Sequence, residues 1–202
     1  MVLIMSYIIR YSSFVVLFTL ILSLYGCEET SSSWVPFEDL PEGYTLEEAK
    51  KDNCVVKENG DVTSGKEVWE SFLKKTENNE PASVRMVHYY TLGDKERYDE
   101  SYYESIKNDY PKMYILDFEF DGEKYIWKDY SDEEPRISEY KYLIRYEEND
   151  PPESATFESA VYYILVNENT YTLDQIQWSM LSSQSTDWID FKYTCIEYDY
   201  KD

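Results

Sequence analysis

The one histidine of the chain is the first residue to consider for chemistry. The 202 residues contain a single His, His88, which is followed by Tyr89 and Tyr90. An imidazole can act as a general base near neutral pH. However, no Ser or Cys nucleophile lies in a turn such as Gly-x-Ser-x-Gly, and His88 falls on an otherwise apolar strand face. We therefore interpret His88 as a structural residue with satisfied hydrogen bonds.

Three carboxylates alternate along one predicted strand, at Asp117, Glu119 and Asp121. Two of them could serve as the acid and base of a glycosidase, or bind calcium. The hairpin predicted below places Lys124 opposite Glu119 and Lys128 on the same face, which describes a solvated, salt-bridged surface. No segment has EF-hand spacing, and one His excludes a multi-His metal centre. We expect no cofactor and no dedicated metal ion.

Aromatic residues are unusually frequent, with 22 Tyr and five Trp. Aromatic rings stack on sugars and pack on peptides, but a Tyr-rich core is the simpler explanation. Tyr140, Tyr142 and Tyr146 follow a strand period, so we assign them to the core. The aromatic residues that are free of such a pattern make a candidate binding face: Tyr102, Tyr103, Tyr125 and Trp188.

Local sequence signals predict the helices that position these side chains. Capping boxes pair an N-cap hydroxyl with a Glu or Gln three residues later. Three occur: Thr45 with Glu48, Ser64 with Glu67, and Thr172 with Gln175. They predict helices over residues 46–51, 66–77 and 173–182. A weaker pattern predicts a helix over residues 100–107, before Pro111.

Alternating apolar residues predict strands over residues 84–90, 140–146, 161–167 and 189–198. The alternation slips at Ile196, which indicates a bulge. Asp121-Gly122 suits a two-residue turn joining residues 113–128 into a hairpin, with Glu119 opposite Lys124 and Phe118 opposite Tyr125. Asn59-Gly60 predicts a second turn, which links strands over residues 54–57 and 61–63. The pattern favours an α+β fold: a mostly antiparallel sheet of about five to seven strands with two or three short helices packed on it.

The first 26 residues read as an export signal. They hold one basic residue, Arg10, and an apolar run of 11 residues, 14–24. A membrane span needs about 20. Residues 24–27, Leu-Tyr-Gly-Cys, resemble a bacterial lipobox, although Tyr25 is larger than usual at its position. We expect cleavage before Cys27 and lipidation of Cys27, with a plain anchor helix as the alternative. Residues 27–43 then form a tether and 44–202 one globular domain.

The two remaining cysteines, Cys54 and Cys195, are candidates for a disulfide. Outside the cytoplasm such a bond can persist, and both residues lie in predicted strands. The bond requires Cα atoms less than about 7 Å apart, which the sequence does not give. The alternative is two buried free thiols.

The strong negative charge limits the partners. With 41 acidic and 19 basic residues, the chain carries a net charge of −22. Nucleic-acid binding needs a basic surface, so we exclude it. Long-range attraction favours a cationic protein, and a peptide or glycan is also compatible with the aromatic residues.

Several segments resemble uncharacterised exported lipoproteins of Gram-positive gut bacteria. They are residues 44–56 (YTLEEAKKDNCVV), 58–72 (ENGDVTSGKEVWESF), 81–85 (PASVR), 89–94 (YYTLGD) and 181–185 (LSSQS). The resemblance implies an acidic lipoprotein on the outer face of the cytoplasmic membrane and supplies no catalytic residues.

The sequence therefore favours a lipid-anchored, extracytoplasmic binding module without enzymatic activity. A hydrolase that uses two carboxylates is the second interpretation, and a structural surface protein is the third. A cleft with two carboxylates about 5–9.5 Å apart would favour the hydrolase.

Overall fold

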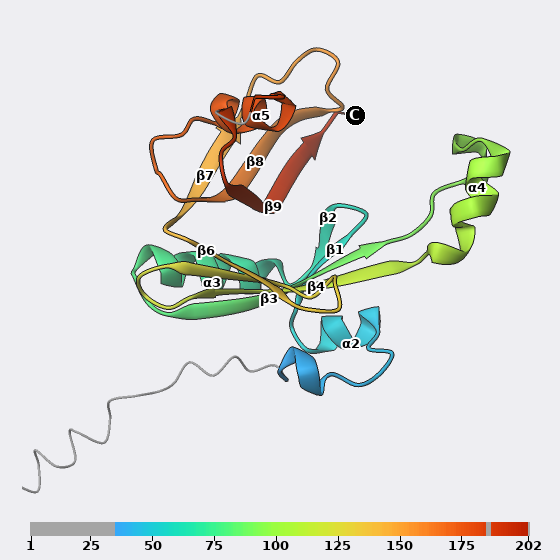
Figure 1. Cartoon of the computed structure of the whole chain (residues 1–202), viewed down its shortest axis with the longest axis horizontal. Helices are drawn as coiled ribbons and strands as arrows, with labels where there is room; N and C mark the ends of the chain where they lie inside the picture. The colour runs from blue at the N-terminus through green and yellow to red at the C-terminus, as the bar shows by residue number, and fades with distance from the viewer. Residues whose placement is uncertain (1–34, 185–186, 202) are drawn as a thin grey trace, which may run out of the picture. The chain divides into compact units, whose positions relative to one another are not determined.

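The computed structural model describes residues 35–184 and 187–201, which contain nine strands in two sheets. Figure 1 shows both sheets and the helices beside them. Cys27 and the predicted signal lie outside the described residues. None of the helices in the described ranges is long and apolar enough to span a bilayer. The α+β class predicted from the sequence is confirmed.

The large sheet has the strand order β2-β1-β3-β4-β5-β6. Its strands are β1 (Val55–Glu58), β2 (Asp61–Ser64), β3 (Ala82–Tyr90), β4 (Lys112–Phe120), β5 (Tyr125–Asp129) and β6 (Arg136–Tyr140). Neighbours are antiparallel except β1 and β3, which are parallel. The parallel pair arises because β2 and a helix intervene between β1 and β3, and parallel strands need such a crossover.

The small sheet has the order β7-β8-β9 and is antiparallel. It consists of β7 (Tyr142–Glu148), β8 (Phe157–Val166) and β9 (Phe191–Tyr200). The sequence predicted one strand over residues 140–146, but Tyr140 ends β6 beside Tyr125, whereas Tyr142 begins β7 beside Val166. Tyr140 is buried and Tyr142 is exposed because the two halves of that segment join different sheets.

Residues 35–184 and 187–201 also form four α-helices: α2 (Leu46–Lys51), α3 (Lys66–Glu77), α4 (Glu100–Ile106) and α5 (Leu173–Leu181), with short 3₁₀ turns at Phe37–Asp39, Lys95–Arg97 and Lys107–Asp109. The predicted capping boxes at Thr45 and Thr172 are confirmed. The predicted box at Ser64 is wrong, because Ser64 pairs with Val56 as the last residue of β2. Gly65 is the N-cap instead, with a φ of +75°, and a side chain there would clash with the Cys54 carbonyl.

The β4–β5 hairpin differs from the prediction by two residues. Glu119 faces Ile126 and Phe118 faces Trp127. The turn is longer than expected because the Asp121 carboxylate accepts hydrogen bonds from the backbone N–H groups of Glu123 and Lys124 at 2.8 and 2.9 Å. A shift of two residues keeps every side chain on its predicted face. The Asn59-Gly60 turn is as predicted, with positive φ at both residues.

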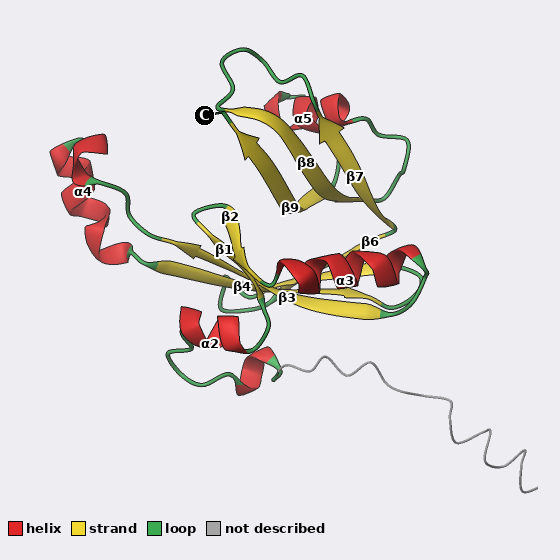
Figure 2. Cartoon of the chain, turned by 180° about the vertical axis from the view of Figure 1, so that it is seen from behind, coloured by secondary structure: helices red, strands yellow, loops and turns green. Residues whose placement is uncertain are grey.

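Each face of the large sheet carries its own core. On one face, α3 inserts Trp69 and Phe72 against Val84, Met86 and Phe118, and Leu165 and Cys195 of the small sheet join this cluster. Figure 2 shows α3 running along this side and α2 on the opposite side.

The second face is covered by α2 and the segment before it. Phe37 stacks on Tyr130 with ring centroids 4.0 Å apart, and Leu40 and Tyr44 pack on the same cluster. The segment 35–43, which we expected to belong to the tether, therefore includes residues packed on the domain.

Candidate ligand-binding cleft

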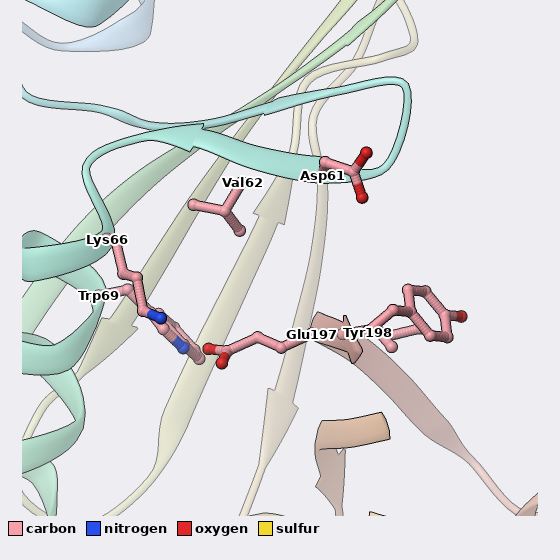
Figure 3. Close-up of a pocket in the computed structure, with 7 residues that line it drawn as sticks. Asp61, Val62, Lys66, Trp69, Glu197 and Tyr198 are labelled. Atoms are coloured by element: carbon pink, nitrogen blue, oxygen red, sulfur yellow. The ribbon is translucent and has the colours of Figure 1, made fainter. Parts of the chain in front are cut away.

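Two adjoining pockets lie where the large sheet meets β9, and together they form the candidate cleft. The Trp69 pocket, drawn in Figure 3, has a volume of about 250 Å³ and is lined by residues of β2, α3 and β9. The Lys57 pocket has a volume of about 230 Å³ and is lined by residues of β1, β3 and β9. Ile196 and Tyr198 line both pockets, so the two adjoin each other. Each is smaller than the ~300–1,000 Å³ of a drug-sized site, which suits a small ligand.

A bulge in β9 shapes the shared wall. Tyr193 lies opposite Ile164 and Cys195 lies opposite Tyr163, so Thr194 is the extra residue. The Thr194 hydroxyl donates to the Tyr163 carbonyl at 2.9 Å. The slip predicted at Ile196 therefore occurs two residues earlier. As a result, Cys195 joins the cluster around Trp69 instead of sharing the face of Tyr193.

Lys57 is the most unusual side chain of the cleft. It is 6% exposed and lies on β1, in parallel register with His88 of β3. It forms no hydrogen bond or ion pair with any residue that the structure describes. Its ammonium is not among the fully buried nitrogen atoms, so the charge faces the pocket that Lys57 lines. Lys57 was not among the residues predicted to bind a ligand, although a lysine directly after Val55 and Val56 in a predicted strand was a usable signal.

His88 lines the same pocket and is not fully satisfied. Its Nδ1 lies 3.4 Å from the Tyr90 hydroxyl, whereas its Nε2 is buried without a hydrogen-bond partner. Burial and then the charge of Lys57 lower the His88 pKa to about 4. The imidazole is therefore neutral at physiological pH. The prediction of a histidine with satisfied hydrogen bonds is wrong at Nε2.

The Trp69 pocket contains a second buried nitrogen. Trp69 Nε1 has no hydrogen-bond partner among the described residues. Figure 3 shows the Lys66 ammonium and the Glu197 carboxylate extending toward the Trp69 ring from α3 and β9. Neither Lys66 nor Glu197 forms an ion pair within the part of the chain that the structure describes. The pocket thus offers an indole donor, a cation and an anion to a ligand.

The candidate aromatic face is not assembled. Tyr125 is 8% exposed and packs against Phe118 and Phe120 in the core, so its prediction as a surface residue is wrong. Tyr102 is 56% exposed on α4, where Tyr102 and Tyr103 both contact Tyr98.

The fourth predicted residue of that face belongs to a different part of the fold. Trp188 is 64% exposed after α5 and donates from Nε1 to the Ser182 carbonyl at 3.1 Å. The predicted set is thus divided between the core, α4 and the segment after α5.

The carboxylates of β4 do not form an acid–base pair. Asp117 is buried and accepts two hydrogen bonds from Arg85, at 2.6 and 2.8 Å. Glu119 pairs with Lys128 at 2.6 Å, as the surface interpretation predicted. Asp121 stabilises its own turn. Lys124, which we expected opposite Glu119, pairs with Glu139 at 2.7 Å.

Cys54 and Cys195 are both free and buried, so the structure does not contain the disulfide that we considered. Cys54 packs with Ala49 and Val56 on the α2 side of the large sheet, and Cys195 packs with Trp69 on the α3 side. The sheet separates them. Burial raises the pKa of each thiol to about 11, which makes both unreactive.

Within residues 35–184 and 187–201, no three His, Cys, Asp or Glu side chains are grouped so as to hold a metal ion. Comparisons with protein-family models, with curated proteins and with solved structures found no match. The geometry of the cleft is therefore the main guide to function.

Proposed function

We propose that this chain is a lipid-anchored, extracytoplasmic binding protein that takes a small ligand into the cleft without converting it. One observation carries the proposal: the Trp69 indole N–H and His88 Nε2 are buried without a hydrogen-bond partner in the described chain, and they line adjoining pockets. Buried polar groups in native proteins are almost always satisfied, and a bound ligand is one way to satisfy them.

The proposed location follows from residues 24–27 and from the charge. Cleavage before Cys27 removes Arg10 and no acidic residue, so the mature chain is more negative than the −22 of the precursor. Two acyl chains on Cys27 are sufficient for stable anchoring. Anionic lipid headgroups repel such a domain within about 8 Å at physiological salt, so it stands off the outer face of the cytoplasmic membrane.

Lipidation is tested by mass spectrometry of the membrane fraction, together with a Cys27→Ala variant. We expect an acylated N-terminal Cys27 in the wild type and loss of processing in the variant. A variant that remains in the membrane with an uncleaved N-terminus contradicts the proposal and identifies an anchor helix.

Ligand binding is tested through the indole N–H signals of the mature chain, residues 27–202. A proton–nitrogen NMR spectrum resolves the five Trp indoles, and a Trp69→Phe variant identifies the Trp69 signal. We expect a member of a library of small extracellular metabolites to move that signal, while the exposed Trp178 and Trp188 signals stay in place.

A matched pair of variants locates the binding site. Val62 points into the Trp69 pocket in Figure 3, so Val62→Phe should fill it and block binding. Ile137→Phe enlarges an exposed residue of β6 and should have no effect. If no library member moves the Trp69 signal, or if Val62→Phe binds normally, the cleft is not a binding site and the structural interpretation gains support.

A hydrolase is the second candidate because Asp61 and Glu197 both line the Trp69 pocket. Asp61 accepts a hydrogen bond from the Tyr200 hydroxyl at 3.0 Å, whereas Glu197 extends toward Trp69 in Figure 3. Incubation of the bound ligand with the protein separates the two functions. A binding protein returns the ligand unchanged, and turnover that Glu197→Gln abolishes would establish the hydrolase.

A further inference from the structure

The geometry points to a small carboxylate as the ligand of the Lys57 pocket. This inference rests on the proposed binding function and specifies the chemical class of the ligand. It depends on three features: the unpaired Lys57 in the pocket wall, the absence of acidic residues from the pocket lining, and the size of the pocket.

The first feature is a cation of the pocket wall that has no counter-charge among the described residues. Lys57 lies between Val56 and Glu58 in a strand whose first three residues are all buried. Its neighbour on β3 is His88, which is neutral. Asp129 is the acidic residue whose charge acts on His88, and it is therefore the one to consider as a partner for Lys57. Asp129 is paired with Arg136 at 2.9 Å, so it does not serve Lys57. A ligand anion would supply the absent charge.

The second feature is the composition of the pocket wall. Although the chain has 41 acidic residues, the lining of the Lys57 pocket contains neither Asp nor Glu. The wall instead combines Lys57 with the phenols of Tyr90, Tyr193 and Tyr198 and with Thr194. A pocket with one cation, hydroxyl-bearing side chains and no acidic residue favours a negatively charged ligand.

The third feature, the size of the pocket, limits the charge and size of that ligand. The pocket volume of about 230 Å³ admits a compact molecule. The net charge of −22 opposes polyanions and highly charged phosphates at long range. One ammonium balances one negative charge, and aromatic side chains suit an apolar body. These limits select a monocarboxylate with a short aliphatic or aromatic body.

Two isosteric probes test the charge requirement: fluorobenzoate, which is an anion, and fluorobenzamide, which is neutral. Fluorine NMR measures the binding of each to the mature chain. We expect fluorobenzoate to bind at least about tenfold more tightly, as for one charge-assisted hydrogen bond in a buried site. Lys57→Met keeps the apolar stem and should abolish this preference. Lys124→Met removes an exposed cation of the β4–β5 turn, outside the cleft, and should retain it.

Several results would overturn the inference. They are equal binding of the two probes to the wild type, a preference that persists in Lys57→Met, a preference that disappears in Lys124→Met, and no binding of fluorobenzoate. Thermal melting checks that each variant is folded, and Lys57→Gln provides a polar replacement if Lys57→Met does not fold. The proposed binding function fails separately, if no library member moves the Trp69 signal. A neutral ligand that moves it, together with equal binding of the two probes, would preserve that function and refute the carboxylate.

Discussion

Arg85 and Lys57 are both buried cations of the large sheet, yet their surroundings are opposite. Arg85 is 1% exposed on β3, where it makes two hydrogen bonds to Asp117 and a third to the Val35 carbonyl at 2.8 Å. The Tyr130 hydroxyl also donates to Asp117, at 3.2 Å. Lys57 is almost as buried on the other face of the sheet, but the described residues give it no partner.

The comparison separates a structural charge from a functional one. Arg85 joins the N-terminal segment to the sheet through a network in which every group has a partner. Such a network is costly to break, although it contributes little net stability. A cation kept without a partner destabilises the folded state, so its presence is better explained by binding.

The largest effect is expected from breaking the Arg85 network. Asp117→Asn leaves the buried guanidinium without a counter-charge and should lower the free energy of unfolding by about 3–5 kcal/mol, as measured by urea denaturation. Glu119→Gln is the matched control two residues along β4, because it removes a partly exposed ion pair worth less than about 1 kcal/mol. Equal losses in the two variants would show that the buried pair has no special role.

The second effect concerns His88, which lies beside Lys57. Its pKa is about 4 in the folded chain and 6.5 ordinarily. Between these values the unfolded chain takes up a proton that the folded chain does not. Stability should therefore decrease as the pH falls from about 6.5 to about 4, by up to about 1.4 kcal/mol per pH unit, and then level off.

Because the chain has one His, NMR titration of a single imidazole measures this pKa directly. In a His88→Gln variant, the decrease in the free energy of unfolding between pH 6.5 and pH 4 that His88 causes should disappear. Bound fluorobenzoate should raise the pKa, because the carboxylate offsets the charge of Lys57. A pKa of 6.5 or above in the free protein contradicts the buried environment described here.

The third effect has the opposite sign to the first. Lys57→Met should raise the free energy of unfolding by up to about 1 kcal/mol, because it replaces a largely buried lysine that has no charge partner with an apolar side chain of similar length. Thermal and urea unfolding of the ligand-free mature chain measure the change. A loss of stability would mean that Lys57 is a structural residue like Arg85.

The smallest effect is expected from Tyr102→Ala on α4. The side chain is exposed and α4 has no buried residue, so the free energy of unfolding should change by less than about 0.5 kcal/mol. Ligand binding, followed by the Trp69 signal, should also be unchanged. Weaker binding in this variant would instead place the ligand on α4.

The sequence by itself determined the elements that depend on neighbouring residues. The boundaries of the helices at 46–51 and 66–77 match α2 and α3, and the caps at Thr45 and Thr172 form as predicted. The Asn59-Gly60 turn is another local feature, since both residues adopt positive φ. Such features can be read from a sequence because their hydrogen bonds join residues only a few positions apart.

Tertiary structure decided everything that depends on which strand pairs with which. It divided residues 140–146 between two sheets and placed Cys54 and Cys195 on opposite faces of one of them. It also set Lys57 beside His88 through the parallel pairing of two strands whose residues are 31 positions apart. In the same way, it placed β9 so that its residues line both pockets. Periodicity indicates which side of a strand is apolar, but it does not identify the strand's neighbour. The cleft consists of such neighbours, and for that reason it emerged only from the folded chain.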